Sequence, residues 1–309
     1  MMKWNDKPYY SLNAFLKEQY GEKIYKLSLS GNMTCPNRDG TLDSTGCIFC
    51  SEGGSGDFAA LYSLSVHEQI QQQKKLMQRK SSGDKFIGYF QSFTNTYAPV
   101  AYLEALFMEA ISHPEIVGLS IGTRPDCLAH DVLKLLERLN KIKPVWIELG
   151  LQTIHEKTAN FINRGYALPV FHKAVIALNR LHIPVIVHTI LGLPDETPTQ
   201  ILETILYLNK LPISGIKLQL LHILKNTPLA TLYENSPFPI YTLEEYLDIL
   251  IMCVEHLSPA MVIHRLTGDG PKRLLIEPLW SGNKKLVLNA IHQEFAKRNT
   301  WQGRLYPHQ

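Results

Sequence analysis

Pro184-Val-Ile-Val-His-Thr-Ile-Leu-Gly-Leu-Pro194 is an apolar, β-branched run that ends in Gly and Pro, and Thr197-Pro-Thr-Gln200 follows it closely. The first stretch is typical of a buried strand. The second is typical of a helix start, because Thr and Gln form a capping box and Pro suits the first helical position. Strand, short loop and helix in this order form one unit of a parallel α/β fold. We therefore predict a strand over Pro184–Ile190, followed by a helix.

Similar apolar runs recur along the chain, and after the first they are about 30 residues apart, the length of a strand–helix unit. They predict five further strands, over Ile24–Leu29, Lys85–Gln91, Gly118–Ile121, Val145–Leu151 and Gly215–Leu221. A second capping box, Ser65-Val-His-Glu68, predicts a helix that runs toward Arg79. Six such units predict an α/β fold, a partial TIM-like (β/α)6 barrel with its chemistry at the carboxyl ends of the strands.

The pattern changes after Leu221. Asn226–Pro239 is rich in Pro, Asn and Thr and predicts a long loop, Leu243–Glu255 predicts a helix, and Met261–Arg265 predicts a short strand. We expect three parts in the chain: an N-terminal segment (1–23), the barrel core (24–265) and a small C-terminal extension (266–309).

The composition is that of an ordinary globular protein of 309 residues, 45% hydrophobic and 19% charged. The 19 Gly and 18 Pro exclude collagen-like and low-complexity classes. Five cysteines are too few, and odd in number, for a disulfide scaffold. The N-terminus lacks the order of a signal peptide, and no apolar run approaches the ~20 residues of a membrane helix. A cytoplasmic protein without a membrane segment is expected.

The net charge of +3 is unevenly distributed. Residues 271–309 carry seven Lys or Arg against two Glu, a charge of +5, so residues 1–270 sum to −2 with 24 basic and 26 acidic side chains. The basic end could meet phosphates, with Trp280, Trp301 and Tyr306 for base stacking. It could equally be a solvated helix over Lys284–Lys297 that packs Leu286, Ala290 and Ile291 inward.

Three of the five cysteines crowd into one segment, Cys35-Pro-Asn-Arg-Asp-Gly-Thr-Leu-Asp-Ser-Thr-Gly-Cys47-Ile-Phe-Cys50. The Pro, Asn, Asp and Gly residues make it a turn-rich loop, which is a poor fit for core packing. It closely follows the first predicted strand, at the end of the barrel that carries chemistry. Three thiolates there predict a metal site.

Two kinds of metal site remain open for these cysteines. A structural zinc ion needs a fourth ligand, and the sequence offers neither a second C-x-x-C pair nor a nearby His in a motif. His67 lies 17 residues beyond Cys50, inside a predicted helix. Three cysteines without a fourth ligand suit a [4Fe–4S] cluster with one open iron.

At these residues the sequence resembles the radical S-adenosylmethionine (SAM) superfamily, and within it the YtqA/YhcC-like bacterial branch related to the Elongator catalytic subunit. The commonest superfamily pattern has three residues between the first two cysteines, whereas here eleven residues separate Cys35 from Cys47. Expanded spacing is a feature of this branch. The resemblance implies that Cys35, Cys47 and Cys50 bind three irons of a [4Fe–4S] cluster. SAM would bind the fourth iron and be cleaved reductively to a 5′-deoxyadenosyl radical.

The resemblance also implies which residues contact SAM. Phe49 lies between two cysteines, where relatives place an aromatic residue near adenine. The other candidates stand at or near the ends of the predicted strands, and the Ile121–Asp126 stretch resembles the T-R-P-D run of Elongator-like enzymes. These candidates are Gln91, Ser92, Thr94, Thr123, Arg124, Glu148, Gln152, Arg164 (on the SAM carboxylate) and His188 (on the ribose).

Further polar residues lie on the last predicted strands. Period-2 alternation places Lys217 and Gln219 on one face and His222 on the other, and those that face inward would bound a substrate cavity. No role is assigned to Arg265. Cys127 and Cys253 are predicted to be packing residues, since free cysteine is usually buried.

The Elongator likeness suggests tRNA as the partner and the C5 substituent of a wobble uridine, in an mnm5s2U-type pathway, as the target. No acetyltransferase-like segment follows the barrel, so chemistry with acetyl-CoA is not expected. A flavodoxin or ferredoxin would supply the electron. Two alternatives stay open at this point: a radical SAM enzyme acting on a small metabolite, and a zinc-binding, non-enzymatic nucleic-acid-binding protein.

Overall fold

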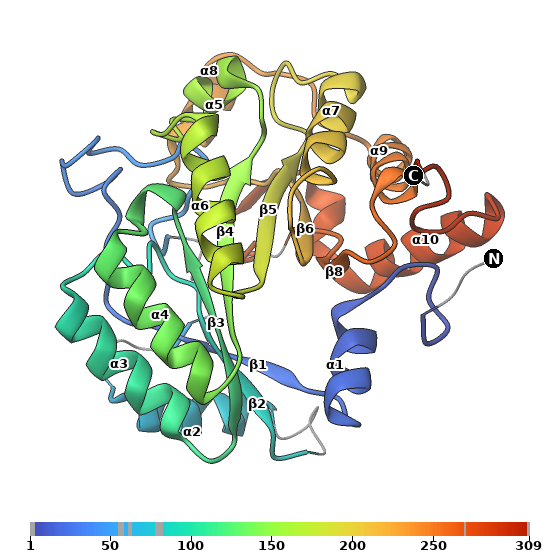
Figure 1. Ribbon diagram of the computed structural model, residues 1–309. Helices are drawn as coiled ribbons and strands as arrows, with labels where there is room; N and C mark the ends of the chain where they lie inside the picture. The colour runs from blue at the N-terminus through green and yellow to red at the C-terminus, as the bar shows by residue number, and fades with distance from the viewer. Residues whose placement is uncertain (1–3, 55–58, 61–63, 78–82, 269, 308–309) are drawn as a thin grey trace.

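The computed structural model describes residues 4–54, 59–60, 64–77, 83–268 and 270–307. One curved parallel sheet dominates it (Figure 1). In spatial order, which is also chain order, its strands are β1 (Tyr25–Leu29), β2 (Phe86–Phe90), β3 (Ile116–Thr123), β4 (Val145–Gln152), β5 (Val185–Leu191), β6 (Gly215–Leu220) and β8 (Val262–Arg265). The end strands β1 and β8 do not pair, so the predicted partial barrel is confirmed.

The helices lie mainly on the outer face of this sheet, as α3, α4 and α6 show in Figure 1. The crossover helices are α2 (Val66–Met77), α3 (Val100–Ser112), α4 (His130–Ile142), α5 (Glu156–Phe161), α6 (Leu168–Arg180) and α7 (Pro198–Leu208). The remaining ones are α1 (Leu12–Tyr20), α8 (Pro228–Asn235), α9 (Leu243–His256), α10 (Lys284–Lys297) and the 3-10 turns η1 (Pro125–Cys127) and η2 (Leu279–Gly282). Strands β7 (Ile223–Leu224) and β9 (Leu275–Glu277) pair separately and antiparallel.

Strand alternation decides what faces the helices and what faces the barrel interior. On β4, Val145, Ile147, Leu149 and Leu151 are buried in the outer core against the helices. Trp146, Glu148 and Gly150 alternate with them and therefore point inward. Among them, Trp146 packs in a small inner cluster and Glu148 and Gly150 line a cavity. Apolar packing on one face thus leaves the other face for polar side chains.

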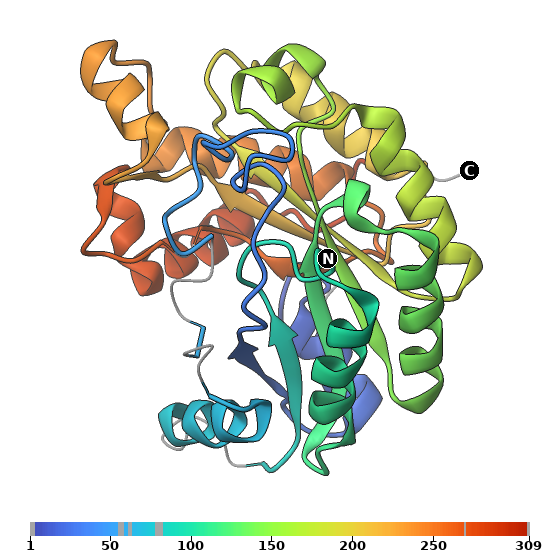
Figure 2. The ribbon, with the colours of Figure 1, turned by 90° about the vertical axis from the view of Figure 1, so that its left-hand side faces the viewer.

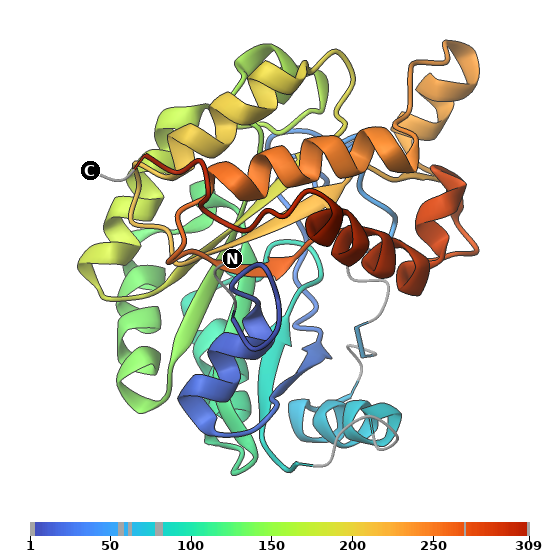
Figure 3. The ribbon, with the colours of Figure 1, turned by 90° about the vertical axis from the view of Figure 1, so that its right-hand side faces the viewer.

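The N-terminal segment closes one end of the barrel. Helix α1 begins at Ser11, whose side chain accepts from the Ala14 amide. Phe15 meets Trp146 edge-on at 6.3 Å, and Leu16 is buried with Trp146 in the inner cluster. The Ile263 amide of β8 donates to the Tyr10 carbonyl at 2.7 Å, and Figure 3 shows α1 in blue near β8. The amino-terminal end of the barrel is therefore plugged.

Both predicted capping boxes are confirmed. The side chains of Thr197 and Gln200 each bond the other's backbone amide at the start of α7. Ser65 and Glu68 do the same before α2, which the structure describes as far as Met77. Arg79, toward which this helix was predicted to run, lies outside the described residues.

The loop predicted over Asn226–Pro239 is wrong in its central part, which forms α8. The Thr227 side chain accepts from the Ala230 amide, and Pro228 occupies the first turn, so the segment carries a complete helix start. Leu229 and Ala230 pack in a satellite core. Thr227 and Pro228, which contributed to the loop prediction, are the N-terminal signals of this helix.

The C-terminal extension packs on the same core as the barrel. Helix α10 lies beside α9 (Figure 3) and buries Val287, Ile291 and Phe295. The prediction that Leu286 packs inward is wrong, since it is 47% exposed, whereas Ala290 and Ile291 contact the core. Within the described ranges, no helix combines the length and apolar character that crossing a bilayer requires.

Candidate functional site

A cavity opens at the carboxyl ends of the strands, opposite the plug formed by α1. Figure 2 shows the blue segment that follows β1 lying over this end of the sheet. The structure brings together most of the site residues predicted from sequence. Those that line the cavity are Cys35, Cys47, Phe49, Cys50, Gln91, Thr94, Thr123, Arg124, Glu148, Gln152 and His188. Ser92 and Arg164 are buried and do not line it.

The cysteine loop is held by Arg38. Its guanidinium donates to the carbonyl oxygens of Cys50 (2.9 Å) and Ser51 (2.7 Å) and so ties the two ends of the loop together. Gly46 makes this possible: it has a left-handed φ of 81°, and a Cβ there would lie 2.7 Å from Arg38 Nε. The close approach of this backbone to Arg38 explains a glycine directly before Cys47.

The three thiols influence one another electrostatically. The hydrogen bond between Cys47 and Cys50, together with burial, raises the pKa of the Cys47 thiol well above its ordinary value, and Cys35 adds to this. The charge of Arg124 opposes the shift. Thiols bind metals as thiolates, so bound iron would release their protons.

A [4Fe–4S] cluster fits this donor set. Cys35, Cys47 and Cys50 are all unpaired by disulfides and partly exposed, and all line the cavity. In such a cluster each cysteine binds a different iron, so the sulfurs surround a body larger than one ion. In the part of the chain that the structure describes, no group of three His, Cys, Asp or Glu converges on a single-ion site.

Asn37 is a site residue that the sequence analysis missed. It is fully buried, donates from Nδ2 to the Asn163 carbonyl at 2.6 Å, and lies 3.7 Å from Cys47 Sγ. Gly165 has a φ of 79°, and a Cβ there would lie 2.4 Å from Asn37 Oδ1. Asn37 thus joins the cysteine loop to the segment after α5. In sequence it reads as one more turn former after Pro36.

Replacing Asn37 with alanine is expected to lower the free energy of unfolding by about 1–3 kcal/mol, because it removes the hydrogen bond that the buried Asn37 side chain donates to the Asn163 carbonyl. The loosened loop should also lose bound iron faster on gel filtration. Urea unfolding and iron analysis measure both effects. Ser44→Ala, an exposed change in the same loop, is the matched control. Wild-type stability and iron retention in Asn37→Ala would contradict this role.

Arg164 occupies a different place from the one its predicted contact with the SAM carboxylate would need. It is 1% exposed, and its guanidinium donates to the carbonyl oxygens of Leu151 (3.2 Å), Thr153 (2.7 Å) and Tyr166 (3.0 Å). Arg124, unlike Arg164, lines the cavity, and its guanidinium pairs with Asp126 at 2.8 Å. Arg164 therefore holds the backbone after β4.

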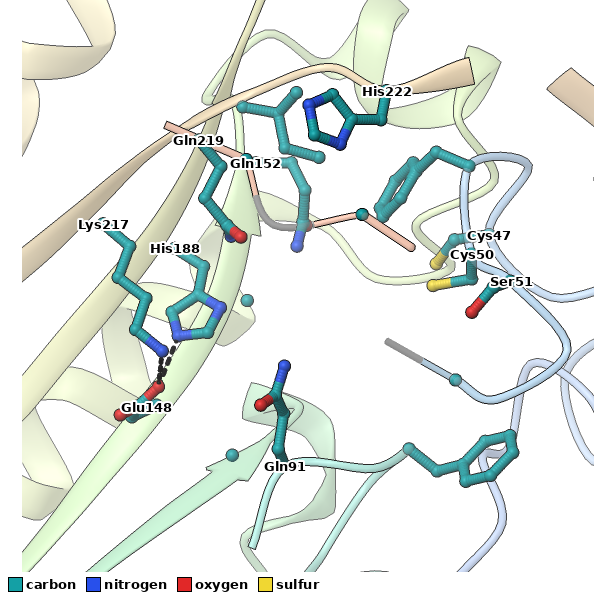
Figure 4. A pocket seen from close by; sticks show the side chains of 18 of the residues that line it. Cys47, Cys50, Ser51, Gln91, Glu148, Gln152, His188, Lys217, Gln219 and His222 are labelled. Carbon is teal, nitrogen blue, oxygen red and sulfur yellow. Dashed lines mark hydrogen bonds and ion pairs between the residues drawn. The ribbon is translucent and has the colours of Figure 1, made fainter. Parts of the chain in front are cut away.

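At the other end of the cavity, Glu148 is the centre of a buried polar network (Figure 4). Its Oε1 accepts from Lys26 Nζ and Ser120 Oγ, both at 2.6 Å. Its Oε2 accepts from Tyr89 Oη (2.9 Å), from His188 Nε2 (2.7 Å) and from Lys217 Nζ. The side chain of Glu148 is 0% exposed. Five donors from five strands converge on one carboxylate.

This network decides the protonation of its members. Burial opposes ionisation of Glu148, but Lys217 and Lys26 outweigh it and hold the pKa of the carboxyl well below its usual range. Burial, with the charge of Lys217, lowers the pKa of His188 to about 4. Since an ionised carboxylate only accepts, the neutral His188 donates from Nε2 and keeps Nδ1 as an acceptor. Burial lowers the pKa of Lys217 to about 7.

Lys26 and Tyr89 are further members that the sequence analysis missed. Lys26 follows from alternation, because Leu27 and Leu29 face the outer core and Lys26 must then face inward. Tyr89 lies in strand Phe86–Phe90, in which every residue is buried. The apolar sequence of this strand gives no sign that the Tyr89 hydroxyl group has a hydrogen-bond partner.

Three glutamines lie between the two ends of the cavity. Figure 4 shows Gln91, Gln152 and Gln219 between Cys47 and Cys50 on one side and Glu148 on the other. Gln152 has a φ of 64° where β4 is irregular, which turns its amide over Gly150. His222, predicted on the opposite face from Lys217, also lines the cavity, because the strand ends at Leu220 and alternation ends with it.

The two remaining cysteines are outside this cavity. Cys253 is fully buried in α9, as predicted for a packing residue. Cys127 is partly buried on η1, with its Sγ 3.9 Å from Asp126 Oδ1, and burial raises the pKa of its thiol to about 12. Neither is among the described residues that line the cavity.

Comparison with known proteins identifies the family. The family model described as "Radical SAM superfamily" matches residues 35–208, and the "Radical_SAM C-terminal domain" matches residues 213–297. The uncharacterized protein YtqA of Bacillus subtilis is 42% identical over 301 residues, 97% of this chain and 94% of that protein. Protein YhcC of Escherichia coli is 36% identical over 87% of this chain and 86% of its own length.

The fold is also found in a solved structure. The archaeal Elp3 of Methanocaldococcus infernus superposes with a TM-score of 0.70 over 90% of this chain and 64% of its own, at 14% identity. The chain belongs to the radical SAM superfamily, in the branch of YtqA and YhcC, and as a radical SAM enzyme it uses a [4Fe–4S] cluster and SAM.

Proposed function

We propose that Cys35, Cys47 and Cys50 bind three irons of the cluster and that the walls of the cavity bind SAM. The observation that carries this proposal is the position of the three cysteines in one loop at the mouth of a cavity that is plugged at its other end. When bound, the cluster and SAM supply a carbon-centred radical that abstracts a hydrogen atom from the substrate.

The residues of the chain have separate tasks in this proposal. The polar side chains on the strand ends, Gln91, Thr94, Thr123 and Gln152, offer hydrogen bonds to SAM, and Arg124 offers a guanidinium for its carboxylate. Phe49 gives the adenine an apolar neighbour and His188 offers the ribose an acceptor at Nδ1. The plug formed by α1 keeps water from entering behind the reacting groups. A flavodoxin or ferredoxin in the cytoplasm would supply the electron.

The substrate in this proposal is tRNA, and the modified group is the C5 substituent of a wobble uridine. The likeness to the Elongator catalytic subunit supports this, including the Thr123–Asp126 run at the cavity. So does the exposed pair Lys272 and Arg273, which directly follows the cavity-lining Pro271. Phosphates of a nucleic acid that enters the cavity would pass these two cations.

The rest of the basic end supports tRNA binding less. Arg298 pairs with Glu294 and Asp248, Lys297 with Glu294, and Arg304 with Glu255. Trp280 is used internally, since its ring lies 5.5 Å from that of Tyr246. The proposal of tRNA binding therefore rests on Lys272 and Arg273, the cations of the basic end that follow the cavity-lining Pro271, and not on the terminal helix as a whole.

Replacing both Lys272 and Arg273 with alanine is expected to weaken tRNA retention in gel shifts and to make its dependence on salt shallower by about two phosphate contacts. Lys297→Ala, which removes a cation paired with Glu294, is the control and should bind as wild type does. Unchanged affinity and salt dependence in the double variant would rule out this entry route.

Nucleoside mass spectrometry of bulk tRNA from a strain lacking the protein tests the substrate itself. We expect one wobble-uridine derivative to disappear and its precursor to accumulate. An unchanged nucleoside profile would remove tRNA as the substrate and leave a small metabolite in its place.

A further inference from the structure

Two leucines of the C-terminal extension are exposed on neighbouring elements. Leu279 on η2 is 68% exposed, and Leu286 on α10 is 47% exposed although the sequence predicted that it packs inward. The two elements are in contact, and Figure 3 shows α10 at the surface. Exposed leucines among polar side chains are typical of a protein interface. We define the η2–α10 face by these leucines and the exposed polar residues that line a hollow on α10 with Leu286: Leu279, Lys285, Leu286, Asn289 and Gln293.

The sequence around this face is cationic. Residues 269–293 carry four Lys or Arg against Asp269 and Glu277, a charge of +2. The sequence of α10 contains one acidic residue, Glu294, and its carboxylate is paired with Lys297. A centre of leucines in positive surroundings complements an acidic protein.

A packed core leads from this face toward the cysteine loop. Ile276 of β9 packs on the same satellite core as Ile48 and Phe49. Those two residues lie between Cys47 and Cys50 in the sequence. Leu279 is three residues beyond Ile276, so their Cα atoms are at most about 11 Å apart. The face and the proposed ligands of the cluster thus adjoin one continuous piece of packed protein.

A second exposed leucine near the cluster has the opposite surroundings. Leu42 lies in the cysteine loop itself and is 53% exposed. Asp39 and Asp43 flank it in the sequence. Hydrogen bonds from Thr41 lower the pKa of Asp39, and those from Thr45 lower the pKa of Asp43, so both carboxylates are ionised at neutral pH. An acidic partner is repelled there and attracted to the η2–α10 face.

We propose that the η2–α10 face is the docking site of the electron donor, a small acidic protein that carries a low-potential redox group. One electron passes from the reduced donor to the cluster, so the donor is oxidised by one electron and the cluster is reduced by one. Redox partners of this kind meet over small interfaces. The inference rests on the proposed function and assigns the surface that its electron donor uses.

The leucines favour a protein over RNA at this face. RNA is held mainly through its phosphates and through stacking of its bases. The aliphatic side chains of Leu279 and Leu286 supply neither a cation nor an aromatic ring. Lys272 and Arg273, which are assigned to RNA above, are not members of this face.

The test compares protein donors with a small reductant. The reconstituted holoenzyme is titrated with flavodoxin and with ferredoxin, both acidic, by calorimetry. The rate of SAM cleavage is then measured with each reduced protein and, separately, with dithionite. In the double variant Leu279→Ser and Leu286→Ser, we expect the affinity for the protein donor and the rate that it supports to fall at least about fivefold. The rate with dithionite should stay as in wild type, because a small ion needs no docking face.

A charge reversal tests the same face without touching the leucines. Lys285→Glu should weaken docking of the protein donor and make its dependence on salt shallower. Ile142→Ser and Lys134→Glu are the matched controls on α4, where Ile142 is 51% exposed and Lys134 is exposed. Both should bind the donor and cleave SAM as wild type does.

Each other outcome counts against the inference in its own way. Wild-type affinity for the donor in the double variant, or a wild type that binds neither protein, overturns the docking site while the proposed function stands. If the double variant is also slow with dithionite, Lys285→Glu decides, and unchanged donor affinity in it overturns the site. Weaker tRNA retention with unchanged donor affinity assigns the face to RNA, and a dimer that the double variant abolishes assigns it to a second copy; either result overturns the inference. No SAM cleavage with any reductant overturns the proposed function and this inference with it.

Discussion

Anaerobically reconstituted protein with Cys47 replaced by alanine is expected to hold less than one iron per chain, where wild type holds about four. Cys47 lies between Cys50 and the Asn37 side-chain amide, and its replacement would leave two of the three cysteines to hold the iron. The visible absorbance of the brown protein should disappear with the iron. SAM cleavage under reducing conditions should fall below detection.

Cys127→Ser is the control for this experiment. Cys127 lies two positions after Pro125, close to the cavity-lining Arg124, and burial is the main cause that raises the pKa of its thiol. It is not among the described cavity residues. We expect it to keep its iron and absorbance. Full iron content and SAM cleavage in Cys47→Ala would contradict the ligand assignment.

Replacing Glu148 with glutamine is expected to lower the free energy of unfolding by about 3 kcal/mol, since it leaves Lys26 and Lys217 buried with no anion between them. Glutamine has nearly the same side-chain volume as glutamate. The loss of stability would therefore come from the missing charge and not from a cavity. Urea unfolding at pH 7 measures it. Glu137→Gln, which breaks an exposed pair with Lys141, is the control and should match wild type. Wild-type stability in Glu148→Gln would show that the network contributes nothing.

The same carboxylate makes stability depend on acid pH. The pKa of Glu148 in the fold is well below that of the unfolded chain, which is about 4.3. Its stabilising contribution is therefore complete above pH 4.3 or so and is lost as the pH falls toward the folded pKa. Wild type should lose stability over this acid range more steeply than Glu148→Gln. Parallel curves for the two proteins would contradict the assignment.

Much of this structure could be predicted from local signals. The six strands are buried runs bounded by loop residues, and capping boxes such as Thr197 with Gln200 marked the helix starts. The inward position of Glu148 follows from alternation on β4, because its neighbours Ile147 and Leu149 need the outer core. The three clustered cysteines predicted a metal site, and the family resemblance implied that this site holds a [4Fe–4S] cluster.

What could not be predicted depends on contacts between distant segments. Arg164 looked like a ligand-binding side chain, and only the fold shows carbonyl groups of Leu151 and Thr153 around it. Tyr89 enters the site through partners on other strands, Glu148 and Lys217, which its own apolar run does not reveal. The helix α8 lay in a segment whose Pro and Thr serve equally in loops and in helix starts.

The most direct test of the central claim is the formation of 5′-deoxyadenosine, measured by mass spectrometry. The reconstituted protein is reduced and given SAM with bulk tRNA from cells that lack it. We predict that 5′-deoxyadenosine accumulates, and faster with this tRNA than with tRNA from wild-type cells, which is already modified. A colourless protein that holds stoichiometric zinc and forms no 5′-deoxyadenosine would contradict the account.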